Sequence, residues 1–233
     1  HQILWILEGR LLITQRLKMK KVLKNVSFVF LLLKMCIVFG QKPATQKRIV
    51  IDVGHGGKDS GAVGINFVQE KDVVLNIALE VLRLNKKSKT PLDIFLTRYN
   101  DTLISLSDRT KLAKALKADL FISLHCNHSD NANARGIEVY VTNTKSQFSG
   151  LSTLLAYLLQ ACFKKELGFE SRGVKFANFQ VLRENVDYRP AVLVEVGFLS
   201  NEDEGFYFLQ PSKVKAVAMA ILKGIYNYSN KRL

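Results

Sequence analysis

The sequence predicts an α/β protein: one domain with a mostly parallel or mixed central β-sheet and helices on both of its faces. Short β-type segments alternate along the chain with longer segments whose apolar residues recur at helical spacing. Several of the β-type segments are apolar along most of their length, which is typical of strands buried on both faces. With 233 residues, the chain is long enough for one domain with a substantial core.

The alternation of elements begins at residue 48 and continues to about residue 230. Strands are predicted at residues 48–53, 93–97, 120–124, 136–141 and 190–196. Helices are predicted at residues 70–86, 107–116, 151–167 and 212–228, and Ser107 is the expected N-cap of the second of these. The glycine-rich stretch GHGGKDSGAVG follows the first strand as a loop.

The first 47 residues differ in character from the rest of the chain. Residues 1–18 are expected to be an upstream extension outside the fold, and residues 41–47 a linker. Residues 19–40 combine a basic start, an apolar stretch and small residues near Gly40, which predicts a signal peptide; a retained N-terminal anchor is the alternative. The signal predicts export to the periplasm or cell envelope.

The net charge of +14 comes largely from the N-terminal segment. Residues 1–49 contain ten Lys or Arg and one acid, so the remainder of the chain carries a net charge of +5. No run of basic residues interleaved with aromatic residues occurs in the body, and we therefore expect no nucleic-acid partner. Cys126 and Cys162 are too few for a disulfide framework and are expected to be buried thiols.

Ionisable groups gather where the predicted strands end. His55 follows the first strand, His125 ends the third, and Glu195 lies near the end of the fifth inside the apolar run AVLVEVGF. Glu70 begins the helix that follows the glycine-rich loop. Ligands of open α/β sheets bind at the carboxyl ends of the strands, so these groups are expected to meet there.

Two histidines and a glutamate suit zinc, leaving a fourth position for water. The sequence therefore predicts one Zn²⁺ held by His55, Glu70 and His125 at the carboxyl edge of the strands. Glu195 is then the candidate base that takes the proton of the water. Alternation along the strand turns Cys126 away from His125, and His128 is expected to support the ligands from outside or to face solvent.

Each of these residues also has an ordinary explanation. A single histidine at a strand end is commonly a surface residue, and Glu70 suits the first turn of any helix. The glycine-rich loop could be a simple turn or a phosphate loop, although it lacks the Gly-Lys-Ser/Thr ending and no GxGxxG is present. The occurrence of all four groups at one sheet edge is what favours a metal site.

The chain resembles the bacterial zinc-dependent N-acetylmuramoyl-L-alanine amidases of the amidase type 3 family, from about residue 48 to residue 228. The resemblance is carried, in order, by IVIDVGHGGKDSGAVG, Glu70 within QEKDVVLNIA, LTR, SLSDRTKLAKALKADLFISLHCNHSD, GIEVYV, RGVKFANFQVLRE and PAVLVEVGFLSNEDE. It implies that residues 48–230 are an amidase catalytic domain. His55, Glu70 and His125 match the zinc ligands of the family, and Glu195 matches its catalytic glutamate.

The resemblance implies cleavage of the amide between N-acetylmuramic acid and L-alanine in peptidoglycan or muropeptides. Arg98, Arg109, Asn127 and Arg183 are candidates for positioning the substrate. Some members of the family that the chain resembles carry a long inserted helix that blocks the active site until an activator binds. The segment between residues 141 and 172 has room for little more than the predicted helix at 151–167, so we expect an open site without an obligatory protein activator. A zinc peptidase cutting within the stem peptide and a wall-binding protein with a decayed site remain alternatives, and oligomeric state is left open.

Overall fold

The computed structural model describes residues 16, 18–27, 30, 47–65 and 67–231. The chain divides into two units, residues 1–45 and 46–233. In the first unit residues 18–27 are helical, while most of the predicted extension, signal peptide and linker lies outside the described residues. None of the helices in the described part of the chain combines the length and apolar character that crossing a bilayer requires.

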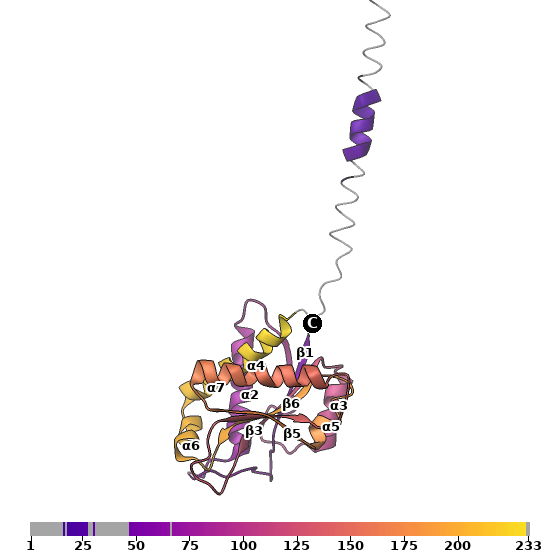
Figure 1. The fold of residues 1–233 in the computed structure, drawn as a ribbon. Helices are drawn as coiled ribbons and strands as arrows, with labels where there is room; N and C mark the ends of the chain where they lie inside the picture. Colours follow the sequence, from indigo (N-terminus) through magenta and orange to yellow (C-terminus); the bar gives the residue numbers. More distant parts are fainter. Residues whose placement is uncertain (1–15, 17, 28–29, 31–46, 66, 232–233) are drawn as a thin grey trace, which may run out of the picture. The chain divides into compact units, whose positions relative to one another are not determined.

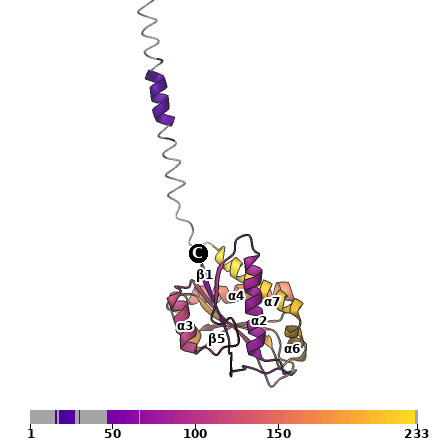
Figure 2. The ribbon, with the colours of Figure 1, turned by 180° about the vertical axis from the view of Figure 1, so that it is seen from behind.

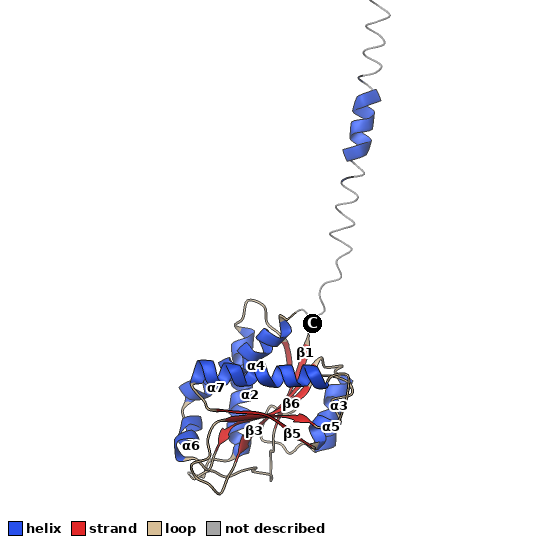
Figure 3. Cartoon of the chain, in the orientation of Figure 1, coloured by secondary structure: helices blue, strands red, loops and turns tan. Residues whose placement is uncertain are grey.

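A mixed central sheet forms the centre of the second unit, as the sequence predicts, but it has six strands and not the five expected (Figure 3). Its strands are β1 (Arg48–Val53), β2 (Asp93–Leu96), β3 (Leu120–Asn127), β4 (Ile137–Thr142), β5 (Ser171–Ala177) and β6 (Ala191–Phe198). Their order across the sheet is β2-β1-β3-β6-β4-β5. β4 runs antiparallel to β6, and the other neighbours pair in parallel.

Helices cover the two faces unequally (Figures 1 and 2). The larger core packs one face against α2 (Glu70–Lys86), α4 (Ser149–Leu167), α6 (Glu202–Leu209) and α7 (Pro211–Ser229). The smaller core packs the other face against α3 (Leu106–Ala115) and α5 (Gln180–Arg183). Alternation along β1 shows the division, because Ile49 and Ile51 belong to the larger core and Val50 to the smaller.

Local features differ from the sequence prediction at several places. The N-cap of α3 is Ser105 and not Ser107, because the Ser105 side chain accepts a hydrogen bond from the Asp108 amide three residues on. β5, α5 and α6 are three further elements that the sequence pattern did not predict. β5 is an edge strand with mostly exposed or half-exposed residues and a left-handed glycine, so it lacks the apolar pattern that identifies a buried strand.

Candidate metal centre

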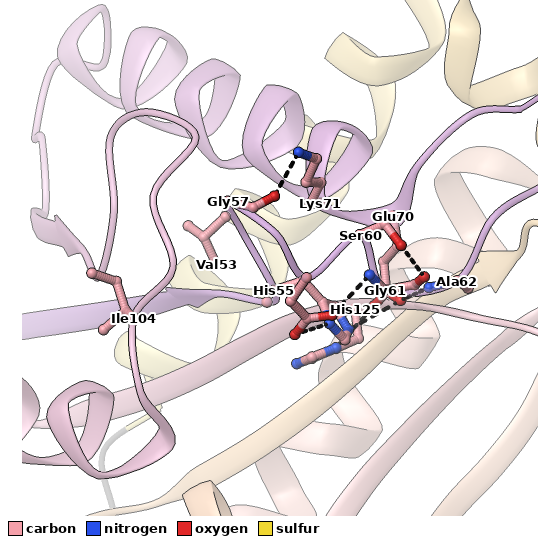
Figure 4. Close-up of polar contacts among 12 residues, drawn as sticks. Val53, His55, Gly57, Ser60, Gly61, Ala62, Glu70, Lys71, Ile104 and His125 are labelled. Carbon is pink, nitrogen blue, oxygen red and sulfur yellow. Dashed lines mark hydrogen bonds and ion pairs between the residues drawn. The ribbon is translucent and has the colours of Figure 1, made fainter.

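Three side chains from three different elements meet at the carboxyl edge of the sheet (Figure 4). His55 comes from the loop after β1, Glu70 is the first residue of α2, and His125 lies near the end of β3. His55 Nε2 is 3.1 Å from Glu70 Oε2, and His125 Nδ1 is 2.9 Å from Glu70 Oε1. The candidate ligand atoms all lie within 4.8 Å of one another, so the predicted ligands are adjacent in the fold.

Two glycines make this approach possible. A Cβ added at Gly54 would collide with the His125 ring, and one added at Gly61 would collide with the Glu70 carboxylate and the His55 ring. Gly61 also has a φ of +64°, a conformation that L side chains rarely adopt. The glycine-rich loop therefore serves to let backbone pass close to the three side chains.

Glu70 is held as an anion by its surroundings. The side chain is buried, and its two oxygens accept hydrogen bonds from the amides of Ala62 and Cys126. Burial acts to raise the pKa of Glu70, but the hydrogen bonds and charges of His125 and His55 outweigh it and hold the pKa well below its usual range. The position at the first turn of α2 favours negative charge as well.

His55 has a second carboxylate partner, which the sequence analysis did not identify. Its Nδ1 is 2.9 Å from Asp59 Oδ2, on the side of the ring opposite Nε2. Histidines that bind metals commonly donate their other ring nitrogen to a carboxylate, which fixes the tautomer and the ring orientation. The signal in the sequence was the acid four residues after His55 in GHGGKDSG.

Glu195 lies directly beside His125, because the two residues are register partners in the parallel strands β6 and β3. Its Oε2 atom is buried and has no hydrogen-bond partner within the described residues. Burial raises the pKa of Glu195 to about 7. With this pKa and no hydrogen-bond partner for Oε2 among the described residues, the Glu195 carboxyl can exchange a proton near neutral pH.

This burial predicts a pH-dependent stability in metal-free protein. Because the raised pKa makes the native state bind the Glu195 proton more tightly than the unfolded state, stability falls as pH rises from about 4.5 to about 7. Glu195→Gln is expected to be more stable than the parent above pH 7, by about 2–3 kcal/mol, and to lose that advantage near pH 4. Urea denaturation of chelator-treated protein at both pH values measures it. If Glu195→Gln differed from the parent in stability by the same amount at both pH values, the raised pKa of Glu195 would be contradicted.

Two of the proposed substrate-positioning arginines are buried and support the loop of His55. Arg98 donates to the carbonyls of Val53, Gly54 and Lys71. Arg109 donates to the carbonyls of Val53 and His55 and pairs with buried Asp52 at 2.8 Å. The two residues are 2% and 3% exposed, respectively, so in this structure both guanidinium groups hold backbone carbonyls in place.

The remaining sequence candidates lie nearer the surface. Asn127, at the end of β3, is half-buried and donates to Glu138. Arg183 is exposed on α5 and bonds to Asn178. His128 is exposed. The Cys126 side chain is buried in the larger core, on the face of the sheet opposite to the His125 side chain. Cys126 and Cys162 are both buried free thiols, as expected.

A cavity of about 440 Å³ opens beside the two histidines. It is bounded by the loop before α3 and by α3 itself, and its lining includes His55, Asp59, Leu103, Arg109 and His125. The two candidate histidine ligands are therefore reached from solvent on the α3 side.

An α/β domain with a His-Glu-His cluster beside a buried carboxyl has the architecture of a metal-dependent hydrolase. Comparison with known proteins defines the family within that class. The family model for N-acetylmuramoyl-L-alanine amidases matches residues 49–227, and the chain belongs to this family.

Individual relatives agree with this assignment. The chain is 37% identical over 189 residues to N-acetylmuramoyl-L-alanine amidase LytC of Bacillus subtilis, a match that covers 81% of the chain and 36% of that relative. It is 35% identical to the probable cell wall amidase LytH of Staphylococcus epidermidis, over 80% of the chain and 60% of that relative. The chain thus spans only part of the length of these curated relatives.

A solved structure shares the fold. The catalytic domain of CwlV, an N-acetylmuramoyl-L-alanine amidase from Bacillus (Paenibacillus) polymyxa var. colistinus, aligns with a TM-score of 0.71 and 38% identity. The alignment covers 79% of the chain and 98% of that domain.

Proposed function

We propose that this chain is a zinc-dependent peptidoglycan amidase that hydrolyses the amide between N-acetylmuramic acid and the L-alanine of the stem peptide. Family membership supports the reaction class. The observation that carries the mechanism is the position of Glu195: it is the register partner of His125 on the neighbouring strand, and its buried Oε2 has no hydrogen-bond partner in the described part of the chain.

The residues present fit zinc. Two imidazoles and one carboxylate form a common donor set for catalytic zinc, and the Asp59 contact would orient His55 for it. When bound by His55, Glu70 and His125, zinc supplies Lewis acidity, which polarises a carbonyl and lowers the pKa of a water molecule. Glu195 accepts the proton of the attacking water and returns it to the amide nitrogen as the carbon–nitrogen bond breaks.

The test measures metal content and product ends together. Purified full-length protein is expected to bind about one zinc per chain and to release free L-alanine amino ends from peptidoglycan. If other amino ends are released instead, the protein is a zinc peptidase that cuts within the stem peptide and not an amidase. Release of no ends at all by the zinc-loaded protein would favour a wall-binding protein.

Metal removal provides a further prediction. Treatment with a chelator is expected to abolish hydrolysis, and about one equivalent of Zn²⁺ should restore it. His125→Ala should lower zinc affinity strongly, because it removes one of three donors, whereas His128→Ala should bind zinc like the parent since His128 is exposed. Zinc titration with a competing chelator distinguishes the two variants. Equal zinc affinity of the two variants would contradict the ligand set.

We further propose that the protein acts outside the cytoplasm in the cell envelope without an obligatory protein activator. The name of the staphylococcal relative as a probable cell wall amidase supports the location. The segment between β4 and β5 contains α4, whose buried residues join the larger core on the face opposite Glu195. That segment therefore leaves the site uncovered, which supports activity of the purified chain alone.

A further inference from the structure

A second buried glutamate continues the line of active-site residues across the sheet. Glu195 on β6 pairs with His125 on one side and with Glu138 of β4 on the other. Residues in directly opposite positions point to the same face, with Cβ atoms about 5 Å apart. His125, Glu195 and Glu138 therefore form a row that begins at the candidate metal centre and runs toward β5.

Glu138 is buried, and four side chains donate to its carboxylate. Two are neutral: Asn127 Nδ2 at 3.0 Å and the Tyr140 hydroxyl at 2.7 Å. The other two are cations from β5, Arg172 at 2.7 Å and Lys175. Glu138 thereby fixes the position of both cationic groups.

The two cations carry more charge than Glu138 neutralises. Among the ion pairs of the described residues, Glu138 is the carboxylate that contacts Arg172 and Lys175, so these three contacting groups together carry one net positive charge. The side chains of Arg172 and Lys175 remain 33% and 38% exposed. A surplus cation at a half-open site favours an anionic group from solvent.

The distance from the metal centre restricts which part of the proposed substrate can reach the two cations. Neighbouring strands lie about 4.8 Å apart, so Glu138, two strands from His125, lies about 10 Å from it. An extended peptide advances about 3.5 Å per residue, so the residue after L-alanine lies about 7 Å beyond the scissile bond. When that residue is D-isoglutamate, it carries a free carboxylate that projects beyond the backbone and can therefore span the remaining distance to the cations beside Glu138.

We propose that Arg172 and Lys175, positioned by Glu138, form a subsite for the free carboxylate of the second stem-peptide residue. This inference rests on the proposed amidase function. The peptide then runs from His125 across β6 and β4 toward β5. Lys175 and Arg172 determine specificity in binding, and Glu138 is a positioning residue that does not contact the substrate.

Two matched substrates test the subsite with zinc-loaded protein. Both are glycan tetrasaccharides bearing the same stem peptide, with either D-isoglutamate or its uncharged amide, D-isoglutamine, at the second position. The parent is expected to prefer the acid by about tenfold in kcat/KM, mainly through KM, because a charge-assisted hydrogen bond is lost with the amide. Added salt should reduce the preference.

Variants of Lys175 test whether this residue causes the preference for the D-isoglutamate substrate. Lys175→Gln should raise KM for the acid about tenfold and change KM for the amide less than twofold. Lys175→Arg should restore part of the preference, and Lys165→Gln, an exposed lysine on α4, should behave like the parent. If Lys175→Gln fails to fold, the preference and salt dependence of the parent decide the question.

The failures of the two proposals are distinguishable. Release of L-alanine ends from sacculi and both tetrasaccharides with equal kcat/KM would overturn the subsite and leave the amidase intact. Equal losses on both substrates in Lys175→Gln would show that the lysine only supports the fold. Absence of L-alanine ends from every substrate, sacculi included, would overturn the amidase proposal and with it the subsite.

Discussion

Glu195→Gln is expected to lower kcat/KM for peptidoglycan by about 10²–10⁴-fold, because general acid–base groups contribute factors of this size. Glutamine has nearly the same shape as glutamate, but its amide side chain neither accepts nor returns a proton in the reaction. The side chain is buried next to His125 without being one of the clustered donor groups, so zinc content should stay near one per chain. Rates of L-alanine end release and metal analysis of the same sample provide the measurement.

A matched control separates chemistry from surface charge. Glu202→Gln changes an exposed glutamate in the first turn of α6 and should retain parental activity. Activity of Glu195→Gln within tenfold of the parent would assign the proton transfer to another group. Loss of zinc together with activity would instead make Glu195 part of the metal site.

Arg109→Met is expected to lower the free energy of unfolding by about 3–5 kcal/mol, the usual consequence of removing one partner from a buried ion pair. Arg109 and Asp52 are 3% and 1% exposed, and their closest charged atoms are 2.8 Å apart. The substitution leaves the Asp52 carboxylate buried without its cation and removes the Arg109 donors to the carbonyls of His55 and Ile104, while the Val53 carbonyl keeps its hydrogen bond from Arg98. Urea denaturation of chelator-treated protein measures the change.

The same helix offers the control for this prediction. Lys111 forms an exposed pair with Asp108, so Lys111→Met should change stability by less than about 1 kcal/mol. In the double variant Asp52→Asn and Arg109→Met, part of the loss should be recovered, because no unpaired charge stays buried. A destabilisation by Arg109→Met as small as that by Lys111→Met would show that the pair contributes little, and its role would then be confined to the His55 loop.

Sequence periodicity was sufficient for the class of fold and for most buried elements. The apolar run before His55 and the helical spacing of apolar residues after Glu70 both result from burial. A buried strand or helix has a recognisable pattern of apolar residues in its own sequence. β5 was not predicted, because an edge strand with charged residues and a glycine lacks this apolar pattern. Glu138, an acid in the apolar strand GIEVYV, gave the same signal as Glu195 and was overlooked.

The sequence by itself determined which residues gather at the carboxyl edge of the sheet, because strand direction and loop position follow from the order of elements. Only the tertiary structure decided what each group does there. Arg98 and Arg109 were candidates for substrate contact, but the fold directs their donors to backbone carbonyls. Register across β3, β6 and β4 placed Glu195 between His125 and Glu138, and such neighbours are set by long-range strand pairing, which no local pattern encodes.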